Sequence, residues 1–156
     1  MVTVQPYLNF KGTTEAAFTF YKSVFGGEFI AMQRFKDTPE GARLPAHEQD
    51  KIMHAALAIG KNTVLMATDA LESAGHQVQE GTNFHLSLQV ESEQEADALF
   101  AALAEGGKVN MPLQSTFWGD YFGMLQDRFG IQWMISYTYP VAVGQTASDQ
   151  QAGTVV

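Results

Sequence analysis

Cysteine is absent from the chain, so the sequence excludes disulfides, thiolate nucleophiles, iron–sulfur clusters and cysteine-based zinc sites. Basic residues are also few. Nine lysines and arginines stand against 17 acidic residues, which gives a formal net charge of −8. This charge balance favours neither nucleic acid nor an anionic membrane as a partner. The chemistry that remains open is that of histidine, carboxylate and apolar side chains.

Long apolar runs are missing too. No stretch reaches the roughly 18 consecutive apolar residues that suggest a membrane span, and no basic segment precedes an apolar run at the amino terminus. We therefore expect a soluble, cytoplasmic protein. The 156 residues, 46% of them hydrophobic, are enough for one globular domain or for two small ones on a shared core.

One pattern of predicted elements occurs twice along the chain. An alternating segment at 2–10 precedes a helical stripe that ends at Gly26, and a second alternating segment at 84–90 precedes a similar helix. The capping box Ser92-x-x-Glu95 opens this second helix. Each helix is followed by three strand-like segments, which are 28–35, 52–59 and 63–68 in the first half and 108–113, 121–126 and 131–139 in the second.

A strand, a helix and three further strands in each half predict an α+β fold built from two βαβββ repeats. A shift of 80 residues pairs Leu8 with Leu88, and Phe20 with Phe100. We place both repeats in a single domain over 1–139, with repeat one at about 1–70 and repeat two at about 81–139. Residues 140–156 lack periodicity and are expected to form a loose tail.

Strand alternation predicts which sheet face carries polar side chains. Leu8 and Phe10 alternate with polar neighbours and are expected to pack on the helix. In the first hairpin, His54 shares its face with Ala56 and Ala58. Since small neighbours leave room, this face is the candidate for a ligand site.

The strings PYLNFKGTTEAAFTFYKSVFGG, HAALAIGKNTVLMATD, EADALFAALAEGGKVNMPLQSTFWGDYFG and DRFGIQWMI resemble the vicinal oxygen chelate superfamily (glyoxalase, bleomycin resistance and dioxygenase proteins), and within it the PhnB-like branch. The resemblance covers about residues 2–138. It implies paired βαβββ units whose mixed sheet curls into a cup with the helices on the outer face. It also implies a homodimer.

The superfamily's enzymes hold a divalent metal at four positions, which the motif match places on Gln5, Val64, His85 and Met134. Only His85 is a good ligand, because alkyl, thioether and amide groups make a poor site for Zn²⁺, Ni²⁺, Mn²⁺ or Fe²⁺. We therefore expect no cofactor, and the resemblance leaves enzymatic activity open. The alternative is a divalent transition metal held by His85 and His54. The third ligand is then either Gln5 or a loop carboxylate, Asp69 or Asp120.

Other chemistry finds less support. No serine stands in a G-x-S-x-G elbow, and no G-x-G-x-x-G loop is present that would cradle a nucleotide-like cofactor. PhnB-like proteins are sometimes labelled methyltransferases, and the sequence does not support that chemistry here. His47 and His76 lie in polar segments and are expected to be exposed.

Two segments remain to be assigned. The aromatic run at 117–123 can wall a pocket or fill the core between the repeats, and both interpretations stay open. The aperiodic segment at 36–50 is a candidate lid, an exposed insertion or a dimer contact.

Three hypotheses follow. The first is a metal-independent protein that binds a small molecule of unknown identity in a cup. Its expected ligand-binding residues are Gln5, Tyr7, His54, His85, Trp118, Tyr121 and Met134. The second is a metal-dependent lyase, isomerase or dioxygenase with a histidine-based site. The third is a structural homodimer whose own side chains close the cup.

Overall fold

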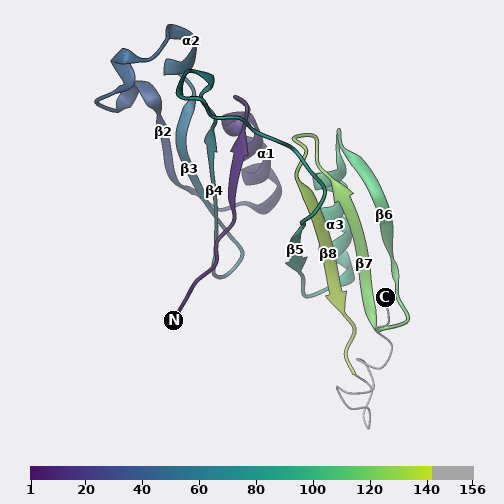
Figure 1. Cartoon of the computed structure of the whole chain (residues 1–156). Helices are drawn as coiled ribbons and strands as arrows, with labels where there is room; N and C mark the ends of the chain where they lie inside the picture. The colour runs from purple at the N-terminus through teal and green to yellow at the C-terminus, as the bar shows by residue number, and fades with distance from the viewer. Residues whose placement is uncertain (142–156) are drawn as a thin grey trace. The chain divides into compact units, whose positions relative to one another are not determined.

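The computed structural model describes residues 1–141 and divides the chain into two compact units that meet between Glu80 and Gly81. Each unit contains one four-stranded mixed sheet and one long helix (Figure 1). The predicted α+β class and the twofold order of strand, helix and three strands are confirmed.

The sheet of the first unit has the order β1-β4-β3-β2. Its strands are β1 (Tyr7–Phe10), β2 (Phe29–Arg34), β3 (Ile52–Ile59) and β4 (Thr63–Asp69). β1 pairs with β4 in parallel, while β3 pairs antiparallel with both β4 and β2. The strand predicted over 2–10 is thus shorter than expected, since only its last four residues join the ladder.

The sheet of the second unit repeats this topology in the order β5-β8-β7-β6. Its strands are β5 (Leu86–Gln89), β6 (Lys108–Ser115), β7 (Asp120–Gln126) and β8 (Gln132–Thr138). β5 pairs with β8 in parallel, and the other pairs are antiparallel. Gly60 and Gly130 both adopt positive φ, at the β3–β4 turn and the β7–β8 turn.

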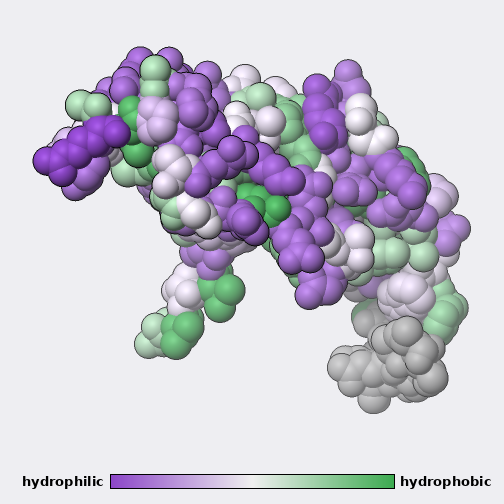
Figure 2. All heavy atoms as spheres, turned by 45° about the horizontal axis from the view of Figure 1, so that its top comes forward, coloured by the Kyte–Doolittle hydropathy of each residue, from purple (hydrophilic) through white to green (hydrophobic). Residues whose placement is uncertain are grey.

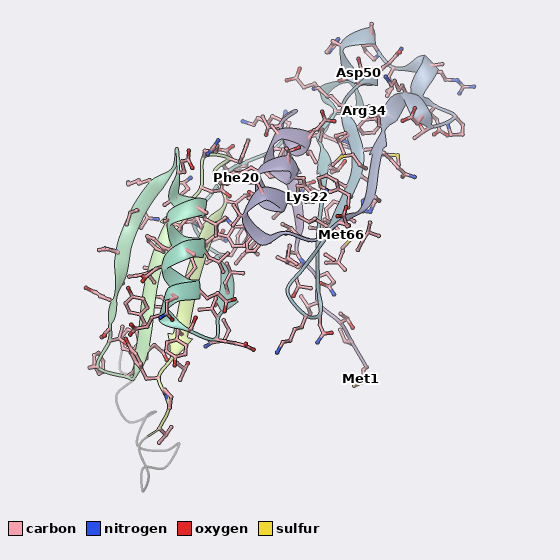
Figure 3. The ribbon with its side chains drawn as sticks, turned by 180° about the vertical axis from the view of Figure 1, so that it is seen from behind. Met1, Phe20, Lys22, Arg34, Asp50 and Met66 are labelled. Atoms are coloured by element: carbon pink, nitrogen blue, oxygen red, sulfur yellow. The ribbon has the colours of Figure 1, made fainter. Side chains whose placement is uncertain are left out.

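One helix covers one face of each sheet, as the stick view of Figure 3 shows from behind. α1 (Thr14–Phe25) buries Ala17, Phe18 and Tyr21, and α3 (Glu93–Ala104) buries Ala96, Phe100 and Leu103. These side chains pack on the apolar strand positions that alternation assigns to the helix. The buried strand residues are Leu8, Phe10, Leu57 and Leu65 in the first unit and Leu125, Trp133 and Ile135 in the second.

The two helices correspond at a shift of 79 residues rather than 80. Phe100 is buried, but Phe20 at shift 80 is only half-buried, whereas Tyr21 at shift 79 is fully buried. β1 and β5 also begin 79 residues apart, and three residues separate β1 from α1, as they do β5 from α3. Ser92 caps that helix by accepting the Glu95 N–H over 3.1 Å, which confirms the predicted cap.

Three short helical turns form in and next to the aperiodic segment at 36–50. These are η1 (Phe35–Asp37), η2 (Gly41–Arg43) and α2 (Ala46–Gln49). Arg34 donates to the backbone oxygen of Asp50 over 2.8 Å, and both residues are labelled in Figure 3. This contact ties the end of β2 to the end of the segment.

Glu48 fixes the same segment to η3 (Glu72–Ala74). Its side chain is fully buried and accepts the backbone N–H of Ser73 over 3.1 Å and the Ser73 hydroxyl. These hydrogen bonds hold the pKa of the Glu48 carboxyl below its ordinary value. The buried Glu48 carboxylate therefore anchors the segment, and the sequence pattern does not predict this contact.

The surface is largely polar where Figure 2 shows it. His47 and His76 are exposed, as predicted. None of the helices formed by residues 1–141 combines the length and the apolar character that a membrane crossing requires. The predicted tail falls almost wholly outside the described residues.

Candidate functional site

The first unit carries a tyrosine–histidine pair on the sheet face opposite α1. The Tyr7 hydroxyl lies 3.3 Å from His54 Nδ1, and the two rings stack with centroids 5.9 Å apart and planes 25° from parallel. Tyr7 belongs to β1 and His54 to β3, so the tyrosine reaches across β4. Tyr7 remains 47% exposed, which leaves its ring open to a further molecule.

Small side chains surround this pair. The strand register places Ala56 beside Met66, and Ala31 beside Ala56, on the face that also holds His54. Ala58 follows on the same face and is exposed. Ala56 is buried, so small side chains rather than bulky ones flank the aromatic pair on this face.

Gln5 lies next to this face, but its side-chain amide is already hydrogen-bonded to backbone groups. Its Oε1 accepts the Val64 N–H over 2.8 Å, and its Nε2 donates to the Asn62 carbonyl over 3.4 Å. The side chain therefore clamps the β3–β4 hairpin to the start of the chain. Its oxygen makes a structural hydrogen bond at the position where the resemblance implies a metal ligand.

The implied metal-ligand set does not fit a transition metal. Val64 offers an alkyl group, Gln5 Oε1 already accepts a backbone hydrogen bond, and Met134 offers a thioether. His85 alone supplies an imidazole, whereas such sites need three or more nitrogen, oxygen or thiolate donors. Over residues 1–141, no group of three or more His, Asp or Glu side chains is placed to hold an ion.

The two carboxylates of the alternative metal site lie at strand ends, in β4 and β7, rather than in loops, and both are engaged in hydrogen bonds. Asp69 is buried and accepts the Thr14 N–H over 3.0 Å and the Ile52 N–H over 2.8 Å. Asp120 Oδ2 accepts the indole N–H of Trp118 over 2.9 Å. Asp69 therefore joins a helix to a strand, and Asp120 orients an aromatic ring.

In the second unit, methionines form a row across the face opposite α3. Register pairs Met134 of β8 with Met124 of β7, and Met124 with Met111 of β6. Ser87 of β5 extends the row on the other side of Met134. All three methionines are half-buried and present flexible, polarizable thioethers. This face suits an apolar ligand better than a cation.

The aromatic run at 117–123 divides between the two faces. Trp118 packs edge-on against Phe122, with ring centroids 6.1 Å apart, and Phe122 belongs to the open face through its pairing with Ser136. Phe117 is 75% exposed and touches Trp118. Trp118 thus extends the apolar surface of the methionine row.

Tyr121 lies on the other face. It donates to Asp97 Oδ1 of α3 over 2.6 Å, and this hydrogen bond is the main reason that the pKa of Tyr121 rises to about 12. The phenol is therefore directed toward the helix and away from Met134. Its expected place among the residues of the open face does not agree with this geometry.

His85 precedes β5 and is half-buried. Alternation places it on the open face with Ser87. Phe122, Met124 and Met111 are not among the expected ligand-binding residues, because only the register shows that they share a face with Met134. Their even spacing along predicted strands was the one available signal.

The chain is similar to several known proteins. The sequence profile of the Glyoxalase/Bleomycin resistance protein/Dioxygenase superfamily matches residues 5–135. The chain belongs to this superfamily. Protein YjdN from Escherichia coli (strain K12) is 32% identical over 141 residues, which span 85% of this chain and 93% of that protein.

Solved structures of the superfamily type are similar as well. Protein PA1353 from Pseudomonas aeruginosa is 42% identical, with a TM-score of 0.79, over 90% of this chain and all of that one. A putative 3-demethylubiquinone-9 3-methyltransferase, PhnB protein, from Bacillus cereus is 26% identical, with a TM-score of 0.71, over 88% of this chain and all of that one. The resemblance to PhnB-like proteins is thereby confirmed.

Proposed function

We propose that this superfamily member is a metal-independent protein that binds a small molecule on the sheet face of its first unit that lies opposite α1. The observation that carries the proposal is the Tyr7–His54 pair, whose rings stack on an uncovered sheet face beside alanines. A stacked tyrosine and histidine supply both an aromatic surface and hydrogen-bonding atoms. Such a combination is typical of ligand sites, which are mainly apolar with a few placed polar groups.

The chemistry of the faces indicates the class of ligand. In the first unit, the phenol and the imidazole can exchange hydrogen bonds with a polar group of the ligand. In the second unit, Met134, Met124 and Trp118 offer an apolar surface. For the first unit we therefore propose a small molecule with at least one hydrogen-bonding group, and the apolar surface of the second unit is a separate candidate site. Association as a homodimer stays a prediction from the resemblance.

Metal independence rests on the donor set. The Gln5 amide is held by the hairpin backbone, and Val64 and Met134 replace donors with alkyl and thioether groups. Of the four implied positions, His85 alone supplies an imidazole. One imidazole is too few ligands for Zn²⁺ or Fe²⁺. The superfamily's metal chemistry is therefore not part of the proposed function.

The test is a thermal-shift screen of small polar aromatic and aliphatic compounds in the presence of EDTA, followed by calorimetry on the hits. We expect His54→Ala and Tyr7→Phe to weaken binding of a hit by about 10-fold each, because each removes one hydrogen-bonding partner next to the ligand. His47→Ala is the matched control, since this exposed histidine lies on α2, outside the face. The affinity of His47→Ala for the same hit should equal that of the wild-type protein.

The rival hypotheses give different results in the same experiment. Compounds that bind only after Zn²⁺ or Fe²⁺ has replaced the EDTA would support a metal-dependent enzyme. Hits whose affinity is unchanged in both His54→Ala and Tyr7→Phe would move binding away from the pair. A screen without hits would favour a structural scaffold whose faces are closed by its own side chains.

A further inference from the structure

A cavity lies at the edge of the first sheet where β1 and β4 end and β3 begins. Its volume is about 480 Å³, within the range of pockets that hold small organic ligands. Its lining includes Lys11, Lys51, Ala70, Glu72, His76 and Gln77. All of these residues belong to the first unit, and none lies on the Tyr7–His54 face.

Strand topology brings the two lysines together. Lys11 follows the last residue of β1, Lys51 precedes the first residue of β3, and β4 lies between these strands. The Ala70 N–H donates to the Phe10 carbonyl over 2.7 Å, which fixes this edge. A Cβ at Gly12 would lie 3.7 Å from Lys51 Cε, so the Lys51 stem runs beside the residue that follows Lys11.

The cavity has more positive than negative groups, although the whole chain has a formal charge of −8. Lys22, Arg34 and Lys36 form ion pairs, whereas within residues 1–141 neither Lys11 nor Lys51 forms one. The nearby carboxylate of Glu48 attracts Lys51 but is hydrogen-bonded to Ser73. Glu72 is the one acidic residue that lines the cavity.

We propose that this cavity is a second binding site, which takes a small organic oxyanion such as a carboxylate or a phosphate ester. Lys11 and Lys51 hold the oxyanion through charge-assisted hydrogen bonds, and His76 and Gln77 offer further donors. Glu72 accepts a hydrogen bond from a hydroxyl or amino group on the body of the ligand. The site is independent of the function proposed for the Tyr7–His54 face.

The test is titration calorimetry of the full chain at low ionic strength with two probes, inorganic phosphate and succinate. Both should bind, and Lys11→Gln and Lys51→Gln should each weaken binding by about 10-fold. Glu72→Gln should strengthen binding several-fold, because it removes the one negative group of the lining. A gain of affinity cannot result from misfolding.

Lys108→Gln is the matched control, because it removes the same charge from an exposed position in the second unit and should leave the affinity unchanged. In amide NMR spectra, the probes should shift Gly75 and His76 most. Absence of binding by both probes, equal losses in Lys108→Gln and Lys51→Gln, or shifts centred outside the cavity would each overturn the proposal. Binding of one probe alone supports the site and shows which oxyanion it accepts.

Discussion

Replacing Asp127 by alanine is expected to lower the free energy of unfolding by about 3–5 kcal/mol. Asp127 is buried at the turn between β7 and β8, and its carboxylate binds three donors. Oδ1 accepts the N–H groups of Phe129 and Ile131 over 2.8 and 3.1 Å, and Oδ2 accepts the Trp133 indole N–H over 2.9 Å. Alanine leaves all three donors without this acceptor.

The measurement is urea unfolding followed by tryptophan fluorescence. Both tryptophans, Trp118 and Trp133, lie in the second unit, so the signal reports that unit. Asp97→Ala is the matched control, because it removes an exposed carboxylate that accepts a single hydrogen bond, from Tyr121. Its effect should be much smaller. Equal effects of the two substitutions would contradict the role given to Asp127.

Asp69→Asn is expected to destabilise the first unit by about 2–4 kcal/mol. The two carboxylate oxygens accept the N–H of Thr14, the first residue of α1, and the N–H of Ile52, the first residue of β3. An asparagine fits the same space but presents an NH₂ group to one of these donors. The substitution therefore turns one buried hydrogen bond into a donor–donor contact.

Amide hydrogen exchange followed by mass spectrometry measures this effect in the first unit, which contains no tryptophan. Peptides that contain Thr14 and Ile52 should exchange faster in Asp69→Asn, while peptides of the second unit keep wild-type rates. Asp37→Asn, at an exposed aspartate, is the control. Unchanged protection at both amides would show that Asp69 does not join the helix to the strand.

Much of the fold was predictable because strand and helix periodicities differ and each half contains both. Leu8 and Phe10 alternate with polar residues, and the capping box at Ser92 marks a helix start that the structure confirms. The shift of 79 residues between the helices was missed, because Gly26 and Gly27 align with Gly106 and Gly107 at a shift of 80 whether or not the buried helix faces do. The helical turns of 35–49 are anchored where Glu48 accepts hydrogen bonds from Ser73. This contact joins two distant segments, and periodicity cannot show it.

The site was predictable in part. Alternation assigned His54 and its alanine neighbours to one face, which the register confirms. It could not show that the Gln5 amide is held by Val64, or that Tyr121 faces α3, since both contacts depend on how distant elements pack. By residue type, Asp69 and Asp127 could be functional carboxylates. In the structure, both accept hydrogen bonds from backbone N–H groups.

We propose that this superfamily member works without a bound transition metal. The direct measurement is elemental analysis of the untagged protein after incubation with Ni²⁺, Zn²⁺, Mn²⁺ or Fe²⁺ and desalting. We predict no stoichiometric metal, because His85 stands among amide, alkyl and thioether groups at the implied ligand positions. About one metal ion per chain, lost in both His85→Ala and His54→Ala, would contradict the account and restore a metal-dependent enzyme.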